Sequence, residues 1–206
     1  MPTIPISPAI SQCENDEPPT ALTLALPRRR HLKQLWAVMA DDHAFHQYSD
    51  LFPRTARTAQ AALARGTMRL WVVLDGATPV GWWSIHDRSR GADGQLGAWL
   101  GCFFVPGSRG RIAVRSFPLF RDLLQSVGLH RLFVAIKQGN RQAQWFASRV
   151  GFRRVGTYER FTQFGGTWGN VILYTQNAAD IGFIWQAAHN RALTAQVLVG
   201  LAPPPQ

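Results

Sequence analysis

Apolar residues recur at two different spacings along the chain, and these spacings predict both helices and strands. Between Arg111 and Val127 they recur every three or four residues, which places them on one face of a helix that Gly128 ends. The segment from Gly94 to Val105 is instead almost uninterruptedly apolar, as in a strand that is covered on both faces. The same criteria predict further helices over Pro27 to Met39, Thr55 to Arg65, Asn140 to Gly151 and Asp180 to Leu198, and strands over Met68 to Asp87 (a hairpin turning at Asp75 and Gly76), His130 to Lys137, Arg153 to Phe161 and Thr167 to Tyr174.

The helix over Asn140 to Gly151 has clear ends and two different faces. Asn140 is a good N-cap because its side-chain oxygen can accept a hydrogen bond from the first turn, and Gly151 suits the left-handed residue after a helix. One face is apolar and the other carries most of the polar residues and arginines. We therefore expect the first face to pack and the second to meet solvent or a ligand.

The composition indicates a folded, strongly basic protein. Of 206 residues 46% are hydrophobic, and 20 Arg and 2 Lys against 12 acidic residues give a net charge of +10. Such a surface attracts phosphates, nucleic acids or acidic proteins, although it would equally suit a plain solvated surface. With only Cys13 and Cys102, no disulfide framework is expected, and no apolar run is long enough to span a membrane. These features favour an intracellular, cytoplasmic protein.

Proline is concentrated at the two ends of the chain. This predicts a Pro-rich N-terminal arm over residues 1–20, a domain over 21–177, and a C-terminal helix with a Pro-rich tail over 178–206. The last helix has an apolar stripe that includes Ile181, Ile184 and Ala188, which must be buried somewhere. Either it packs on its own domain, or it binds a protein partner or a second copy together with the arms.

The order of the elements and the segment after Asn140 resemble the GNAT superfamily of N-acetyltransferases. In that family a strand is followed by Asn, a small residue three positions later, then a basic residue, an apolar residue and Gly-Phe. The corresponding residues are Asn140, Ala143, Arg149, Val150, Gly151 and Phe152. The sequence GGTWGNVILYT near the end is similar to the closing strand of the ribosomal-protein N-acetyltransferase branch, which usually has an acid in place of Asn170. The resemblance implies an α/β GNAT fold, with a mixed central sheet of about six to seven strands flanked by helices.

The resemblance also implies a binding site for acetyl-CoA. Family members hold it in a splay between two parallel strands, which here would be Gly97 to Val105 and Leu132 to Lys137. The pyrophosphate would lie on the N–H groups of the loop Pro106 to Ala113, because a helix N-terminus attracts anions. The loop would equally suit a simple tight turn. The implied cofactor-binding residues are Phe103, Phe104, Val105, Arg109, Gly110, Arg111, Ile112, Ala113, Asn140 and Arg149.

This loop departs from the family pattern. Gly107 stands where Gln or Arg is usual, and Ile112 stands where a small residue lets the phosphates approach. We therefore expect weakened acetyl-CoA binding, and we expect Ile112→Gly to strengthen it.

Few residues are suited to acid–base catalysis. Ala147 occupies the position where many family members have a Tyr that protonates the leaving thiolate, and no acid lies between Leu96 and Val105. His86, at the end of a predicted strand, is the candidate base because a neutral imidazole accepts a proton near pH 7. The alternative is a histidine at a strand end with no catalytic task.

Two other groups of residues have alternative interpretations. His43 and His46 could bind a metal, but no further ligand pattern accompanies them, so we predict no metal and assign them to substrate contact. The tryptophans could stack on nucleic-acid bases, but they fall in predicted strands and a helix, where core packing explains them better. This set is Trp71, Trp82, Trp83, Trp99 and Trp145. Sequence-specific nucleic-acid binding and membrane binding are not expected.

Two functions remain open at this stage. The first is an acetyl-CoA-dependent N-acetyltransferase that acts on a protein or a small amine. The second is a structural or interaction module with the same fold, such as a component or assembly factor of a virus particle.

Overall fold

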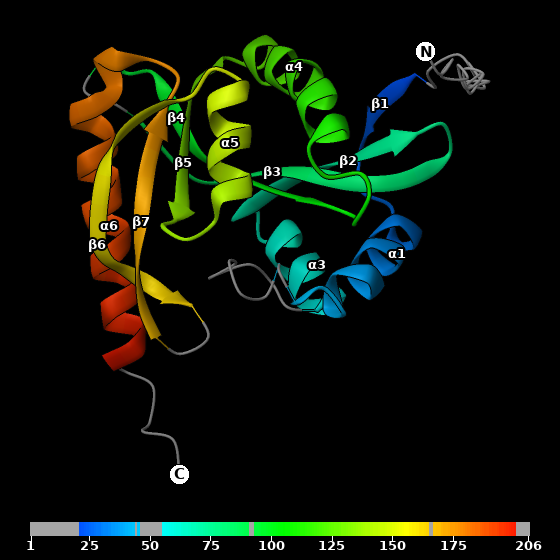
Figure 1. The fold of residues 1–206 in the computed structure, drawn as a ribbon, viewed down its shortest axis with the longest axis horizontal. Coiled ribbons are helices and arrows are strands. Elements are labelled where there is room, and N and C mark those ends of the chain that lie inside the picture. The colour runs from blue at the N-terminus through cyan, green and yellow to red at the C-terminus, as the bar shows by residue number, and fades with distance from the viewer. Residues whose placement is uncertain (1–20, 44, 46–54, 91–92, 165–166, 201–206) are drawn as a thin grey trace, which may run out of the picture.

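A single mixed sheet of seven strands forms the centre of the molecule (Figure 1). The computed structural model describes residues 21–43, 45, 55–90, 93–164 and 167–200. The strands are β1 (Leu22–Ala25), β2 (Met68–Asp75), β3 (Thr78–Arg90), β4 (Leu96–Phe104), β5 (Leu129–Lys137), β6 (Arg153–Phe164) and β7 (Thr167–Thr175). Their order across the sheet is β1-β2-β3-β4-β5-β7-β6. Of these neighbouring pairs, β4 and β5 run parallel and the others antiparallel.

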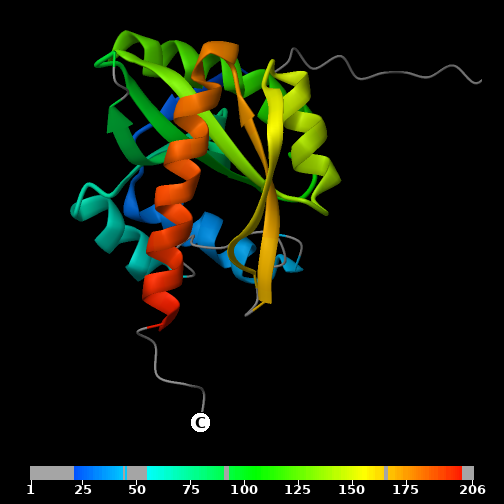
Figure 2. The same ribbon diagram turned by 90° about the vertical axis from the view of Figure 1, so that its left-hand side faces the viewer.

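Helices cover both faces of the sheet (Figures 1 and 2). They are α1 (Arg29–Ala40), α3 (Ala56–Ala64), α4 (Arg111–Ser126), α5 (Arg141–Arg149) and α6 (Ile181–Gly200). On one face, α4 and α5 pack over the central strands. On the opposite face, α1 and α3 cover β2 and β3, and α6 covers β5, β6 and β7. The expected α/β fold with a mixed, helix-flanked sheet is confirmed.

Aromatic side chains fill the core between α4 and the sheet. Trp83 is fully buried, stacks on Phe120 at a centroid distance of 5.5 Å, and donates a hydrogen bond from Nε1 to Ser116 Oγ at 3.1 Å. A buried indole needs such an acceptor, because an unmet N–H would cost about 1–3 kcal/mol. The core role predicted for the strand tryptophans is therefore confirmed, but Trp145 on α5 is 56% exposed.

Helix α4 runs without interruption through Pro118, although an internal proline usually kinks a helix. Its N-cap is Gly110, whose φ of 79° lies in the left-handed region that favours glycine. The proline removes one internal hydrogen bond, and the burial of Phe117 and Phe120 on either side of it compensates for that loss.

Sequence patterns missed one strand and left the position of one helix open. Strand β1 has only four residues and is separated from α1 by Leu26, Pro27 and Arg28, so it has too few positions to show alternation. The apolar stripe of α6 is buried against its own sheet, where Ile184 and Ala188 contact the aromatic cluster around Trp99 and Phe161. Residues 1–20 lie outside the described part, so association through the arms stays a prediction.

Candidate functional site

The parallel strands β4 and β5 separate after a short paired stretch. Their register runs from Leu96 opposite Leu129 to Trp99 opposite Phe133 and ends there, although β4 continues to Phe104 and β5 to Lys137. Beyond Phe133, β5 remains paired on its other edge with β7. The two strands therefore splay apart, at the place that the sequence predicted.

Alternate residues of β4 present their backbone groups to the splay. The N–H of Val105 donates to Val80 C=O at 3.0 Å across the β3 edge. Because backbone direction alternates in an antiparallel ladder, Phe103 and Val105 face β3, whereas Cys102 and Phe104 direct their N–H and C=O groups into the splay. Of the three β4 positions that the resemblance implied, Phe104 is thus the one whose backbone can pair with a ligand there. Cys102 was missed because alternation depends on the register.

The start of α4 offers unpaired amides beside the splay. The N–H of Arg111 bonds to Arg109 C=O and that of Val114 to Gly110 C=O, but within the described residues those of Ile112 and Ala113 have no acceptor. Both belong to the first turn, where no acceptor within the helix exists. Two N–H groups at the positive end of a 16-residue helix form a binding place for an oxyanion.

The side chain of Ile112 points into the core, so it does not lie across these amides. It is 7% exposed and belongs to the cluster of Phe117 and Phe120. The obstruction expected from the sequence does not follow from this packing. The Ile112 side chain instead fills space in the core beneath α4.

We expect Ile112→Ala to destabilise the protein without improving cofactor binding. Removing three carbons from a packed site costs about 2–4 kcal/mol of unfolding free energy. Urea denaturation measures this cost, and calorimetric titration with acetyl-CoA tests the second part. A variant of unchanged stability that binds acetyl-CoA more tightly would restore the obstruction hypothesis.

Arg109 is engaged within the protein. Its guanidinium pairs with Asp42, which follows the end of α1, and its Nε donates to Phe104 C=O at 3.1 Å. Partial burial lowers the pKa of the Arg109 guanidinium, and the Asp42 carboxylate also accepts the N–H of Phe45 at 3.1 Å. Arg109 thus ties the loop before α4 to the opposite face and holds the loop in place.

A basic groove lies between the first turns of α4 and the outer face of α5. It has a volume of about 380 Å³ and is lined by Arg111, Val114, Arg115, Trp145 and Arg149. Among the described residues, no acid lines it. A Cβ on Gly110 would lie 4.0 Å from the Trp145 ring, so the groove begins next to the N-cap of α4. This arrangement explains why α5 has an exposed tryptophan and arginines opposite its packed face.

Asn140 has the structural role that its position predicts. Its Oδ1 accepts the N–H of Ala143 at 3.1 Å and so caps α5. This cap fixes the start of the helix that carries Trp145 and Arg149.

His86 is linked to two residues that sequence reasoning missed, to Asp87 by a hydrogen bond and through it to Arg191 by an ion pair. Its Nδ1 lies 3.2 Å from Asp87 Oδ2, and the same oxygen lies 3.6 Å from Nη1 of Arg191 on α6. The guanidinium of Arg191 lies over both the Trp99 and the Phe161 rings, with centroid distances of 5.5 and 5.4 Å. The bond from His86 holds the pKa of Asp87 below its usual value, against the effect of partial burial, and the charge of Arg191 adds to this lowering.

The ionised Asp87 determines which nitrogen of His86 is basic. A carboxylate accepts only, so in the neutral imidazole Nδ1 carries the hydrogen and Nε2 carries the lone pair. That Nε2 lies 3.6 Å from the position of a Cβ on Gly101, in the part of β4 beyond its last β5 pair. The imidazole therefore lies against the splay, on the face opposite α4 and α5.

Two further predicted site residues, His43 and His46, precede α3 in the chain. His43 is exposed, and His46 lies outside the described residues. Within the described part of the chain, no three His, Cys, Asp or Glu side chains gather as metal ligands. A search for a spanning segment among the described helices finds none of sufficient length and apolarity.

Comparison with protein families decides the identity of this architecture. Residues 21–153 match the acetyltransferase (GNAT) domain. The chain belongs to the GNAT acetyltransferase family. A search of curated protein sequences gives no match.

Several solved structures share the fold of this GNAT protein. RimJ of Mycobacterium smegmatis, in complex with CoA-disulfide, superposes with a TM-score of 0.66 at 21% identity over 87% of this chain and 91% of its own. The Salmonella typhimurium acetyltransferase that modifies the N-terminal serine of ribosomal protein L7/L12 gives 0.65 at 17% identity, over 76% and 94%. The microcin C7 self-immunity acetyltransferase MccE, in complex with acetyl-CoA and AMP, gives 0.62 at 13% identity, over 75% and 91%.

Proposed function

We propose that this protein is an acetyl-CoA-dependent N-acetyltransferase that acts on a protein or small-amine acceptor. The observation that carries the proposal is the β4–β5 splay, which has a basic groove beside it on one face and His86 against it on the other. The nucleotide end of acetyl-CoA and the amine would then approach from opposite faces. The relatives bound to CoA or acetyl-CoA support this assignment of the cofactor.

The residues on the α4 and α5 face would hold the cofactor. The amides of Ile112 and Ala113 suit the pyrophosphate, and the backbone of Cys102 and the N–H of Phe104 on the β4 edge suit the amide-containing pantetheine arm. The Trp145 ring can stack on adenine, and the three arginines of the groove can pair with phosphates. Bound acetyl-CoA would supply the thioester that the amine attacks.

The opposite face would receive the amine. There Nε2 of His86 can take the proton that the amine must lose, while Asp87 keeps the imidazole oriented. A protein amine and a small amine must both lose a proton, so this role of His86 is the same for either acceptor. Contact of His43 and His46 with the acceptor remains part of the proposal, because both precede α3 in the chain and α3 covers the face on which His86 lies.

We expect Trp145→Ala to weaken acetyl-CoA binding by about 5- to 100-fold. The estimate follows from base–aromatic stacking of about 1–3 kcal/mol, and the exposure of the ring makes a folding defect unimportant. Calorimetric titration with acetyl-CoA measures the loss.

Two further variants sharpen this test. Arg149→Gln should also weaken binding, and more for CoA than for dephospho-CoA if it pairs with the 3′-phosphate. Arg121→Gln is the matched control, because Arg121 lies on α4 but pairs with Asp122 outside the groove. If wild type and all variants fail to bind acetyl-CoA, the proposed function is wrong.

A further inference from the structure

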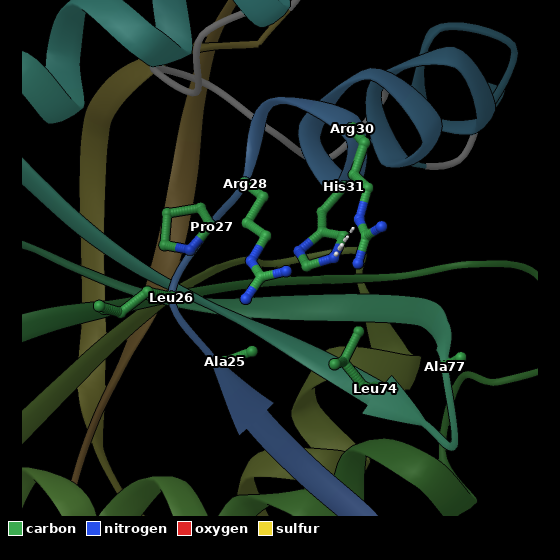
Figure 3. A pocket seen from close by; sticks show the side chains of 8 residues that line it. All are labelled: Ala25, Leu26, Pro27, Arg28, Arg30, His31, Leu74 and Ala77. Carbon is green, nitrogen blue, oxygen red and sulfur yellow. Dashed lines mark hydrogen bonds between the residues drawn. The ribbon is translucent and has the colours of Figure 1, made fainter.

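A second basic cavity lies where α1 begins, away from the acetyl-CoA site. It has a volume of about 470 Å³, within the range of small-ligand sites, and is bounded by the end of β1, the first turn of α1 and the β2–β3 turn (Figure 3). Asp42 and Arg109, which border the site described above, lie beyond the other end of this 12-residue helix. The two sites are therefore separate.

One side of the cavity consists of hydrogen-bond donors. Arg28 is the N-cap of α1 and gives no side-chain cap, so the N–H groups of the first turn keep their donor capacity. In Figure 3, Arg28 and Arg30 extend on either side of the His31 ring toward Leu74. Among the described residues, no aspartate or glutamate lines the cavity to balance these charges.

His31 adds an unused donor that points into this space. His31 is only 4% exposed, and its Nε2 accepts a hydrogen bond from Arg30 Nε at 3.4 Å. Because a guanidinium only donates, Nε2 is the acceptor and Nδ1 carries the hydrogen. Within the described part of the chain that buried Nδ1 has no hydrogen-bond partner. Burial, Arg30 and Arg28 all lower the pKa of His31, in agreement with a neutral ring.

We propose that this cavity binds a small organic phosphate, with its phosphate on Arg28, Arg30 and His31 and its apolar part against Leu26 and Leu74. Two guanidinium groups match the two charges of a phosphate monoester, and an acceptor oxygen satisfies the buried Nδ1. A helix N-terminus contributes further donors to the same anion. The apolar wall, where Leu26 is 74% exposed, favours an ester over inorganic phosphate.

Phenyl phosphate is a suitable probe because it joins a phosphate monoester to an apolar ring. Titration into the full-length protein should shift the ring NMR signals of His31 to saturation. Inorganic phosphate and phenylacetate should each bind at least tenfold more weakly. Equal affinity for phenylacetate would overturn the assignment to phosphate, and equal affinity for inorganic phosphate would overturn the assignment to an ester.

Variants of the cavity residues test whether phenyl phosphate binds in this cavity. The double variant Arg28→Gln/Arg30→Gln changes exposed residues and should weaken phenyl phosphate binding at least tenfold, whereas Arg29→Gln, in the same turn but outside the cavity lining, should change it less than twofold. His31→Phe keeps the ring volume but removes the donor, and should also weaken binding, as followed by calorimetry. The double variant should leave acetyl-CoA affinity unchanged. Weakening by Arg149→Gln instead would place phenyl phosphate in the α4–α5 groove and refute the second site.

Discussion

Replacing His86 by glutamine should lower kcat/KM for acetyl transfer by about 10²- to 10⁴-fold, the usual contribution of a general base. The affinity for acetyl-CoA should stay within about twofold, because the imidazole lies on the face of the sheet opposite the groove. Glutamine keeps a polar side chain of similar length but cannot take up a proton near neutral pH. Steady-state rates with a peptide amine, combined with calorimetric titration, separate the two quantities.

The pH dependence of the rate gives an independent test of His86. A base must be unprotonated, so kcat/KM of the wild type should rise with pH along an acidic limb that His86→Gln abolishes. Asp87 cannot produce this limb near neutral pH, because its pKa is lowered and the carboxylate is already ionised there. His130→Gln, a change at an exposed histidine of β5, is the matched control. A variant at His86 that keeps both the rate and the limb would exclude it as the base.

Asp87→Asn distinguishes a positioning role from a direct one. Asparagine keeps an acceptor oxygen but adds an N–H donor, so it no longer fixes the tautomer of His86, and kcat should fall while KM for acetyl-CoA is kept. The acidic limb should remain but move to lower pH, because a carboxylate that stabilises the protonated imidazole is gone.

Local sequence patterns predicted those parts of the site that depend on nearby residues. The Asn140 cap, the start of α4 at Arg111 and the apolar face of α5 each follow from residues within one or two helical turns. The splay followed from the resemblance to a family.

Contacts between distant segments were not predictable in this way. The direction of the Arg109 side chain depends on its ion pair with Asp42, which is 67 residues away and on the other face of the sheet. The orientation of His86 depends on Asp87 at a φ of 47° and on Arg191 of a helix that lies outside the family match. Trp145 is exposed because its position on α5 faces the groove, although a tryptophan is more often expected in the core. Each outcome is set by tertiary packing.

The packing of α6 favours one of the two alternatives that the sequence left open, burial of its apolar stripe on its own domain. If α6 served only association, deleting residues 180–206 would leave a folded core. The buried Ile184 instead contacts the cluster of Trp99 and Phe161, which the helix shields from water. We therefore expect α6 to be required for the stability of the domain itself.

A matched pair of substitutions on α6 tests this expectation. Ile184→Asp should lower the unfolding free energy by at least about 4 kcal/mol, because it removes a packed side chain and buries a carboxyl group. Ile181→Asp makes the same chemical change at a residue that is 43% exposed, one turn earlier, and should cost less than about 1 kcal/mol. Urea denaturation at several protein concentrations separates folding from association, since an intramolecular contact gives a midpoint that does not depend on concentration. If both variants are equally stable, or if the loss at Ile184 disappears on dilution, the stripe serves a partner and not its own domain.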